Sequence, residues 1–441
     1  MAETLLVKNA FIVTMDHQRR VIEKGYVAID GGTIQRVGEG NPVDINADNV
    51  IDATGQVVIP GLVCAHNHMY GILSHGMPLN APPTSFYGFL KDFWWPQVED
   101  RIGTREITAA TRMACVQMAK TGTTTFADIL EAPKSIPGAL DAEAEIVEKA
   151  GLRGVLSFEA SERAGEKVAE QSLDENVRFI KKWNKHQGLV RGMLCTHTLF
   201  TCSIPFLQTA RELASRLGAG IHIHLEEGVY EADYSKGKYG KLPIEVYENI
   251  GFLGGDLLAS QCVHTQPLEI AIMKKHDVKV AHMPLSNCEV GGGIAPLPEF
   301  LNSGLTVSLG TDGYVTDMFE VTRAAFLIHK GKRQDASMIP ANIAFEMATI
   351  GGARVLKMED QIGSLEVGKQ ADLALLSAKF PTPLTTKNVY DQIVAFGTGS
   401  SVETVVVSGR IIVNNGKTTG VSEDEAKEEC LSAARQFWRR N

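Results

Sequence analysis

VVIPGLVCAHNH, residues 57–68, is an apolar run that ends in two histidines separated by one residue. Residues two apart on an extended strand point to the same side, so His66 and His68 can face one point. Other short apolar runs follow, and segments with helical spacing, such as 105–122 and 204–220, lie between them. We expect eight strands, at residues 56–63, 123–129, 153–160, 191–197, 220–227, 258–264, 278–284 and 305–312. Repeated strand-then-helix units predict parallel strands, and eight of them predict a closed (β/α)8 TIM barrel.

The main alternative to the barrel is a doubly wound open sheet. Such a sheet normally carries a glycine-rich phosphate fingerprint after its first strand, and this sequence has none there. The two ends of the chain instead show short alternating runs broken by glycine turns. We therefore expect a small β-sandwich domain composed of residues 1–56 and 364–441, and a barrel domain at residues 57–363. Residues 422–441 begin with a serine cap and an acidic turn, which predicts a C-terminal helix.

Composition excludes several classes of protein. The 441 residues carry 43 Lys and Arg against 52 Asp and Glu, a net charge of -9 without a basic face for nucleic acid. The apolar runs are shorter than the ~20 residues that span a membrane. An acidic residue stands where a signal peptide would be basic, so we expect a cytoplasmic protein. The seven cysteines are scattered without a C-x-x-C pair, which favours reduced core cysteines.

Polar groups end nearly every predicted strand. They are His66, His68, Asp128, Glu159, His197, His224 with Glu227, His264, His282 and Asp312. In a (β/α)8 barrel the carboxyl ends of the strands converge on one mouth, where active sites are built. Buried polar groups are costly unless they are paired or ligate an ion. A large number of histidines at one mouth therefore indicates a functional site.

The histidine spacing indicates a metal site. His222 and His224 repeat the H-x-H spacing of His66 and His68, and Asp312 ends the eighth predicted strand. Three imidazoles and one carboxylate suit Zn²⁺, with Fe²⁺ as the alternative. The fourth predicted strand contains no lysine that could be carbamylated to bridge two ions, so we expect one ion per subunit. Strand spacing leaves the contribution of His222 open.

Candidates for proton transfer follow the fifth and sixth predicted strands. Glu226 and Glu227 compete for the role of acid and base, because alternation cannot separate them once the chain leaves the sheet. His264 could orient the attacking water, and Asp312 could both ligate the ion and accept a proton. There is no nucleophile elbow and no phosphate-binding loop. Metal-assisted hydrolysis remains, with hydroxide formed at neutral pH because the ion lowers the pKa of its water toward ~7.

These motifs resemble the amidohydrolase superfamily. The resemblance rests on segments 60–77, 222–227, 262–264, 280–287, 295–313 and 346–376 and covers nearly the whole chain. They are similar to the subgroup of cytosine, guanine and methylthioadenosine deaminases and triazine hydrolases (the TRZ/ATZ type). Within it, HNH at 66–68, FWW at 93–95 and TDGYVTDMFE at 311–320 are most similar to the SsnA-type aminohydrolases.

The resemblance implies metal ligation by His66, His68, His224 and Asp312, with Glu227 as acid and base and His264 beside the water. It thereby selects His224 over His222 and Glu227 over Glu226.

For the substrate, the resemblance places His197, His282 and Asn287 nearby. It gives only a loose counterpart, Arg163, for the arginines that hold the nucleoside part in methylthioadenosine deaminases.

We therefore expect a deaminase that releases ammonia from an amino-substituted nitrogen heterocycle of the purine, pterin, pyrimidine or triazine type. A dechlorinase or a cyclic amidase using the same site is the alternative, and a non-catalytic barrel scaffold is a second alternative. We also expect a homodimer or a higher homo-oligomer.

Two groups of residues carry weaker signals. His75 and Trp94 fall in the predicted first loop of the barrel and are candidates for substrate binding. The aromatic residues at 86–95 could form a lid over a planar ring or an oligomer interface. His17, His186, His276 and His329 lie away from predicted strand ends, so we expect surface or capping roles for them.

Overall fold

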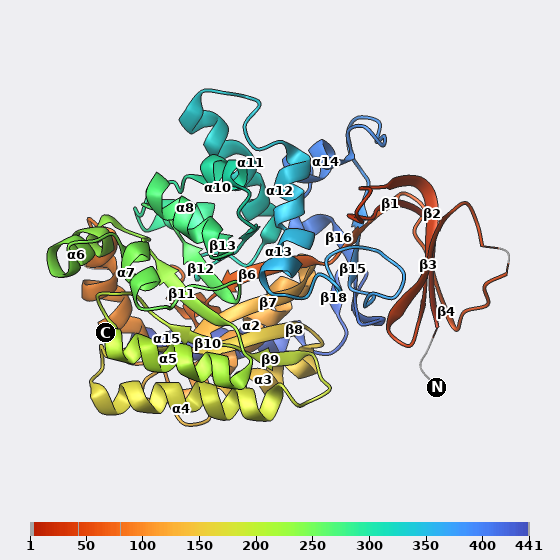
Figure 1. Cartoon of the computed structure of the whole chain (residues 1–441). Helices are drawn as coiled ribbons and strands as arrows, with labels where there is room; N and C mark the ends of the chain where they lie inside the picture. The colour runs from red at the N-terminus through yellow and green to blue at the C-terminus, as the bar shows by residue number, and fades with distance from the viewer. Residues whose placement is uncertain (1–3, 43, 80, 440–441) are drawn as a thin grey trace.

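The structure is a computed structural model that describes residues 4–42, 44–79 and 81–439. Within these residues the chain forms two nine-stranded sheets. One sheet lies at the centre of Figure 1 with helices around it, and the other, toward the right, pairs strands from the N-terminal segment with strands from residues 373–418. No described helix is long and apolar enough to cross a membrane.

The central sheet is the predicted parallel barrel. Its strands are β6 (Leu62–Asn67), β7 (Thr123–Leu130), β8 (Arg153–Ala160), β9 (Val190–Gly192), β10 (Leu194–Thr196), β11 (Ile221–Leu225), β12 (Leu257–Gln261), β13 (Lys279–His282) and β14 (Val307–Leu309). They follow one another in chain order around the barrel, except that β9 pairs only with β8, and every pair is parallel. The first and last strands meet at a single parallel bridge between Asn67 and Asp312.

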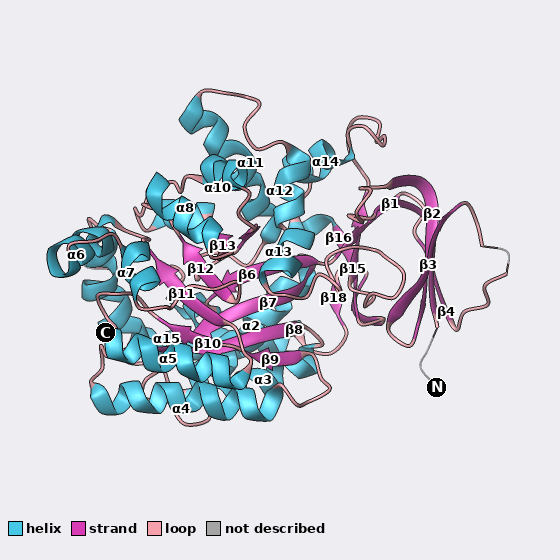
Figure 2. Cartoon of the chain, in the orientation of Figure 1, coloured by secondary structure: helices cyan, strands magenta, loops and turns pink. Residues whose placement is uncertain are grey.

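Helices separate the barrel strands and lie outside them (Figure 2). They are α2 (Thr104–Lys120), α3 (Ala139–Ala150), α4 (Glu166–Trp183), α5 (Ile204–Leu217), α6 (Val229–Tyr239), α7 (Pro243–Asn249), α8 (Pro267–Lys275), α9 (Pro284–Glu289), α10 (Leu297–Ser303), α11 (Met318–Arg333), α12 (Ala341–Met347) and α13 (Ile350–Val355). Their apolar faces pack on the strands in one core. The predicted alternation of strand and helix is therefore confirmed.

The first predicted strand is in fact two strands. Residues 56–63 were expected to form one barrel strand, but β5 (Gln56–Pro60) belongs to the other sheet and the barrel strand β6 begins at Leu62. The chain changes partners at Gly61, whose N–H donates to the carbonyl of Asp372. A Cβ at this glycine would lie 2.1 Å from the Oγ1 of Thr124, so only glycine fits.

The second sheet joins both ends of the chain. Its strands are β1 (Leu5–Val13), β2 (Val21–Asp30), β3 (Thr33–Glu39), β4 (Asn49–Asp52), β5, β15 (Leu373–Ser377), β16 (Val402–Val407), β17 (Arg410–Asn414) and β18 (Lys417–Thr418). The join is the antiparallel pair of β5 and β15. The sheet has its own apolar core, which includes Val7, Ile12, Ile34 and Leu375. A separate β domain from the two ends is confirmed, and its boundaries at 56 and 364 stay a prediction.

The predicted C-terminal helix is α15 (Glu423–Trp438), capped by Ser422, whose side chain accepts a hydrogen bond from the N–H of Glu425. It packs on the barrel helix α2, where Arg112 pairs with Glu429 at 2.8 Å. The indole N–H of Trp438 donates to the carbonyl of Leu73 at 2.7 Å. Leu73 lies in helix η1 (Met69–Ser74), which directly follows His68, so α15 supports the loop behind the histidine motif.

Short helices complete the described chain. They are α1 (Phe86–Gly88), η2 (Phe89–Glu99), α14 (Val389–Asp391), η3 (Gln392–Phe396) and η4 (Gly399–Ser401). The aromatic stretch at 86–95, expected as a loop, is helical: η2 is a π-helix that contains Pro96. A proline removes one N–H donor from the helix ladder, which is compatible with this wider hydrogen-bonding pattern.

Candidate metal centre and active site

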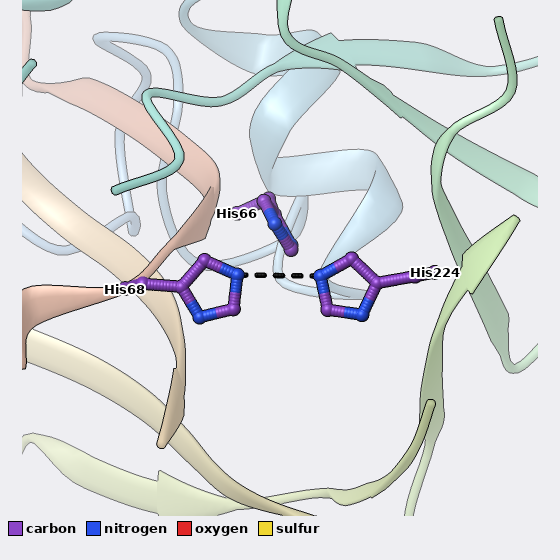
Figure 3. A group of neighbouring side chains, drawn as sticks. All are labelled: His66, His68 and His224. Carbon is purple, nitrogen blue, oxygen red and sulfur yellow. Dashed lines mark hydrogen bonds between the residues drawn. The ribbon is translucent and has the colours of Figure 1, made fainter. Parts of the chain in front are cut away.

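Three imidazoles meet at the mouth of the barrel. His66 lies in β6, His68 directly follows that strand, and His224 comes from β11 on the opposite side (Figure 3). The Nε2 atoms of His68 and His224 are 3.2 Å apart, and the Oδ1 of Asp312 lies 3.5 Å from the Nε2 of His68 and 3.8 Å from that of His66. Ligand atoms about 2.0–2.1 Å from a tetrahedral ion are about 3.3 Å apart, which these separations match.

The oxygens beside the Nδ1 atoms of His68 and His224 favour protons on Nδ1, which leaves the two Nε2 atoms unprotonated. The Nδ1–H of His68 donates to the carbonyl of Ile129 at 2.8 Å, and the Nδ1 of His224 lies 3.2 Å from the Oε2 of Glu159. The carbonyl of Ile129 fixes the proton of His68 at Nδ1, and the nearby carboxylate favours the same tautomer of His224, in which both Nε2 atoms present lone pairs to each other. Two lone pairs at 3.2 Å repel unless a cation lies between them. The donor set therefore fits a divalent cation.

The second histidine of β11, His222, lies next to His66. The Nδ1 of His66 is 3.1 Å from the Nε2 of His222, whereas the Nε2 of His66 has no hydrogen-bond partner among the described residues. His222 thus lies behind His66 and orients it, as a hydrogen-bonding partner does for a ligating ring. Burial lowers the pKa of His66 well below its usual value, so its ring is neutral and available as a ligand.

Asp312 is held by donors on the side away from the histidines. Its Oδ2 accepts hydrogen bonds from the Nε2 of Gln261 at 2.7 Å and from the Oγ of Ser286 at 2.8 Å. Burial would raise the pKa of Asp312, but the His68 charge and the Gln261 hydrogen bond lower it below its usual value. Asp312 also adopts a φ of 59°, a conformation that residues other than glycine rarely adopt outside functional sites.

A cavity of about 460 Å³ opens above these residues. Its walls include His68, His224, Asp312, Glu227 and Glu159, together with the three predicted substrate-binding residues His75, Trp94 and His197. Apolar side chains of α1 and η2 form one wall, namely Phe86, Phe89, Leu90, Phe93 and Trp94. The ring of Phe89 stacks on Trp94 with centroids 5.4 Å apart. Of the two roles considered for the aromatic stretch, this placement supports the lid or stacking wall.

The structure separates the two glutamates that alternation could not. Glu227 lines the cavity, and burial together with the Asp312 carboxylate raises its pKa well above the usual range. Glu226 adopts a φ of 49° and is fully buried, and its N–H donates to the carboxylate of Glu231 at 2.6 Å. Glu227 is therefore the one placed to exchange a proton with a bound molecule.

Besides the buried ligand candidate His66, three predicted site residues lie outside the lining described for this cavity. The ring of His264 donates from Nε2 to the carbonyl of Gly292 at 2.8 Å. His282 is buried, with its Nε2 3.2 Å from the Nε2 of His329. Asn287 is buried, and its side-chain amide has no hydrogen-bond partner among the described residues. The surface or capping role expected for His329 is wrong, because its ring lies inside the barrel wall at 1% exposure.

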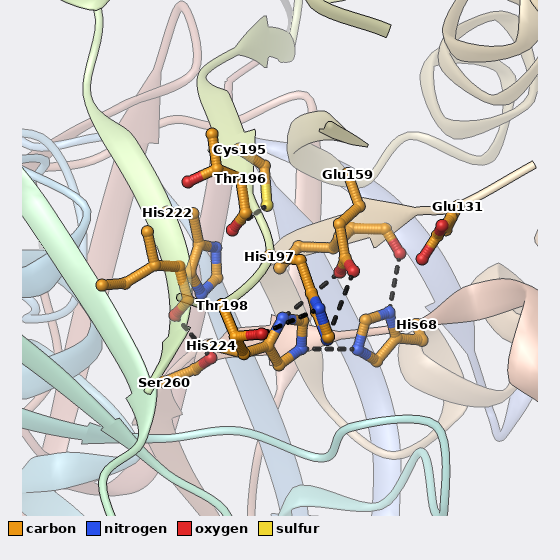
Figure 4. Close-up of polar contacts among 12 residues, drawn as sticks. His68, Glu131, Glu159, Cys195, Thr196, His197, Thr198, His222, His224 and Ser260 are labelled. Atoms are coloured by element: carbon orange, nitrogen blue, oxygen red, sulfur yellow. Dashed lines mark hydrogen bonds and ion pairs between the residues drawn. The ribbon is translucent and has the colours of Figure 1, made fainter. Parts of the chain in front are cut away.

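Glu159 is the main site residue for which sequence reasoning assigned no role. Figure 4 shows its carboxylate reaching the rings of His197 and His224, at 3.6 Å from the Nε2 of His197 and 3.2 Å from the Nδ1 of His224. The three side chains form a second group whose spacing could hold an ion. Its position at the end of β8 was the available signal, but strand order does not show which neighbouring ring a carboxylate meets.

Comparison with known proteins agrees with this geometry. The amidohydrolase family model matches residues 57–412. A 5'-deoxyadenosine deaminase of Methanosarcina acetivorans is 35% identical over 438 residues, 98% of each chain. A 5-methylthioadenosine/S-adenosylhomocysteine deaminase of Moorella thermoacetica is 36% identical over 433 residues, 96% of each chain.

Solved structures share the fold. An adenosine deaminase of Xanthomonas campestris, crystallised with bound zinc, superposes with a TM-score of 0.90 at 24% identity, covering 99% of this chain and 98% of its own. The family match extends over the barrel and part of the second sheet, and the relatives cover almost the whole chain. The chain therefore belongs to the amidohydrolase family.

Proposed function

We propose that this protein is a metal-dependent hydrolytic deaminase that releases ammonia from an amino-substituted nitrogen heterocycle. The observation that carries the proposal is the convergence of His66, His68, His224 and Asp312 at the floor of the cavity that Glu227 lines. Relatives named as deaminases, at 35% and 36% identity over nearly the full chain, support it.

One divalent ion per subunit would be held by these three histidines and Asp312. Zinc is the proposed ion, supported by the zinc in the adenosine deaminase of similar fold, and Fe²⁺ suits the same donors. When bound, such an ion supplies an activated water by lowering its pKa toward ~7.

The protein's own residues supply proton transfer and orientation. Glu227 is placed to take a proton at its carboxylate and to deliver it to the ring nitrogen of the substrate, because its raised pKa lets it hold that proton near neutral pH. Asp312, fixed by Gln261 and Ser286, keeps its Oδ1 directed at the same point and is a second acceptor. The roles proposed for His264, His282 and Asn287 rest on the family resemblance alone.

Purine nucleosides are the first substrates to test, because both deaminase relatives act on adenosine derivatives by name. Phe89 and Trp94 offer a stacking wall for a planar ring, with His75 and His197 as polar contacts. Pterins, pyrimidines and triazines share the planar ring and the amino group. Cytoplasmic location and homo-oligomeric assembly stay predictions from the sequence.

The test is ammonia release by zinc-reconstituted protein from a panel of these heterocycles. We expect turnover on at least one purine nucleoside and a loss of about 10²–10⁴-fold in Glu227→Gln, the range for a lost proton-transfer group. Glu226→Gln, the neighbour outside the cavity, is the matched control and should retain turnover.

Chloride release or ring opening without ammonia would instead support a dechlorinase or cyclic amidase. Full metal occupancy without turnover on any compound would support a scaffold.

A further inference from the structure

The cavity wall carries acidic side chains from five parts of the barrel mouth. They are Glu99 at the end of η2, Glu159 of β8, Glu227 after β11, Glu289 of α9 and Asp312 after β14. Among the described residues that line the cavity, none is a lysine or an arginine. A carboxyl group can accept or, when protonated, donate a hydrogen bond, but in neither state does it neutralise an anion.

The arginine that contacts the end of η2 in this wall is already paired with carboxylates. Arg163 donates to Glu131 at 2.7 Å, to Asp100 at 2.9 Å and to Glu99 at 3.1 Å, and it lies over the ring of Trp95 at 5.1 Å. Three carboxylates thus surround one cation. Arg163 lines a separate hollow with Trp95, so it does not face a molecule in the main cavity.

The histidines that line the cavity beside the metal-binding group are also engaged. The Nε2–H of His75 donates to the carbonyl of Gly313 at 2.8 Å, and His197 bonds the hydroxyl of Thr201 through Nδ1 at 2.7 Å while its Nε2 faces Glu159. At the rim, Glu289 is solvent-exposed on one side, and burial of its other side together with the Asp312 charge raises its pKa. An anionic substituent entering here meets hydrogen-bond acceptors and, among the described lining residues, no lysine or arginine that could neutralise it.

We propose that the site accepts amino-heterocycles whose far substituent is neutral or positively charged and rejects those that carry a carboxylate or phosphate there. This inference rests on the proposed deaminase function and specifies its substrate class. A carboxylate that leaves water for a partly buried wall without a neutralising cation loses enough hydration to reduce kcat/KM by about 100-fold.

Three adenosine derivatives of nearly equal size test the charge directly: 5'-amino-5'-deoxyadenosine, adenosine and adenosine-5'-carboxylate. With zinc-reconstituted protein, we expect kcat/KM for the amine and for adenosine within about 10-fold of each other, and at least about 100-fold lower for the carboxylate. Equal values for adenosine and the carboxylate, or a preference for the carboxylate, would overturn the proposal.

A charge change at the rim adds a second measurement. Glu289→Lys should reduce the adenosine-to-carboxylate ratio of kcat/KM by about 10-fold, and Glu289→Gln by less. Glu212→Gln, on the exposed face of α5, is the matched control and should leave the ratio unchanged. An unchanged ratio in Glu289→Lys would show that the wall charge does not govern selection.

The outcome also separates this inference from the proposed function. If none of the three compounds releases ammonia, deamination of purine nucleosides is wrong. Calorimetric binding of the same compounds then tests the charge preference alone: weaker binding of the carboxylate by at least about 10-fold sustains it. Equal binding, or no binding of any of the three, contradicts it.

Discussion

Two pairs of buried histidines in this protein have the same separation but different surroundings. The Nε2 atoms of His68 and His224 are 3.2 Å apart at the mouth, and those of His282 and His329 are 3.2 Å apart behind β13. At the mouth, the opposite nitrogen of each ring faces an oxygen, from Ile129 or Glu159. The Nδ1 atoms of His224 and His282 both lack a hydrogen-bond partner among the described residues, but that of His224 lies 3.2 Å from a carboxylate oxygen of Glu159.

The difference teaches that distance between imidazoles does not define a metal site. In the pair behind β13 one ring can donate its Nε2–H to the other, so the contact is an ordinary hydrogen bond. At the mouth, a carbonyl and a carboxylate beside the two Nδ1 atoms favour protons there, and the Asp312 carboxylate lies 3.5 Å from the Nε2 of His68. The partners of the far nitrogens and the nearby carboxylate therefore decide which pair suits an ion.

Removal of the carboxylate from the mouth should have the largest effect. We expect Asp312→Ala to reduce turnover by about 10³-fold or more and to leave the purified protein with substoichiometric metal, because one of four ligands and its charge are lost. Ammonia release and elemental analysis measure both. Asp360→Ala, an exposed acid elsewhere, should be unaffected. Normal metal content and rate in Asp312→Ala would show that this carboxylate does not distinguish the histidine pair at the mouth from the pair behind β13.

Replacing the carboxylate beside the Nδ1 of His224 should have an intermediate effect, on metal affinity. Glu159→Gln removes the charge beside the Nδ1 of His224, and loss of such a partner typically weakens metal affinity by 10–100-fold. Competition with a chelator measures the affinity without reference to turnover. Glu289→Gln alters the same cavity without a contact to His224 and should change affinity less than about threefold. Equal affinities in the two variants would mean that Glu159 does not orient the ring.

His329, in the pair behind β13, should affect the pH dependence of stability. Burial lowers the pKa of His329 to about 4 and that of His282 well below its usual value, whereas an unfolded histidine titrates near ~6.5. The unfolded chain therefore binds protons that the folded pair does not, and stability falls as pH drops from about 6.5 toward 4.

We expect His329→Asn to reduce this slope by up to about one proton, with metal content unchanged. Urea midpoints at pH 7.5 and 5 measure it, and His17→Asn, at a side chain 78% exposed, is the control. Identical slopes in wild type and His329→Asn would contradict the assignment.

Strand positions predicted most of the barrel and the mouth where the histidines meet, whereas the choice of His224 over His222 as a ligand came from the family resemblance. His66, His68, His224 and Asp312 end strands, and the carboxyl ends of parallel strands share one mouth. Spacing on one strand also showed that His66 and His68 face the same way.

Contacts across the barrel could not be predicted in this way. His329 lies on helix α11, and nothing in its spacing shows that it meets His282 of β13. The division of residues 56–63 at Gly61 depends on a close approach to Thr124 from another strand. The backbone turns at Glu226, whose φ is 49°, so Glu226 and Glu227 lie in different surroundings. The spacing of residues in the sequence does not predict this turn.

The closure of the barrel has a consequence for when the site forms during synthesis. The ring closes where β6 meets the segment after β14, at the bridge between Asn67 and Asp312, and the proposed ligands lie in or directly after β6, in β11 and after β14. A nascent chain therefore lacks the complete set until residue 312 has left the ribosome and the eighth position of the barrel is filled. Metal loading then follows folding, and an ion bound at that stage joins the earliest and latest strands of the ring.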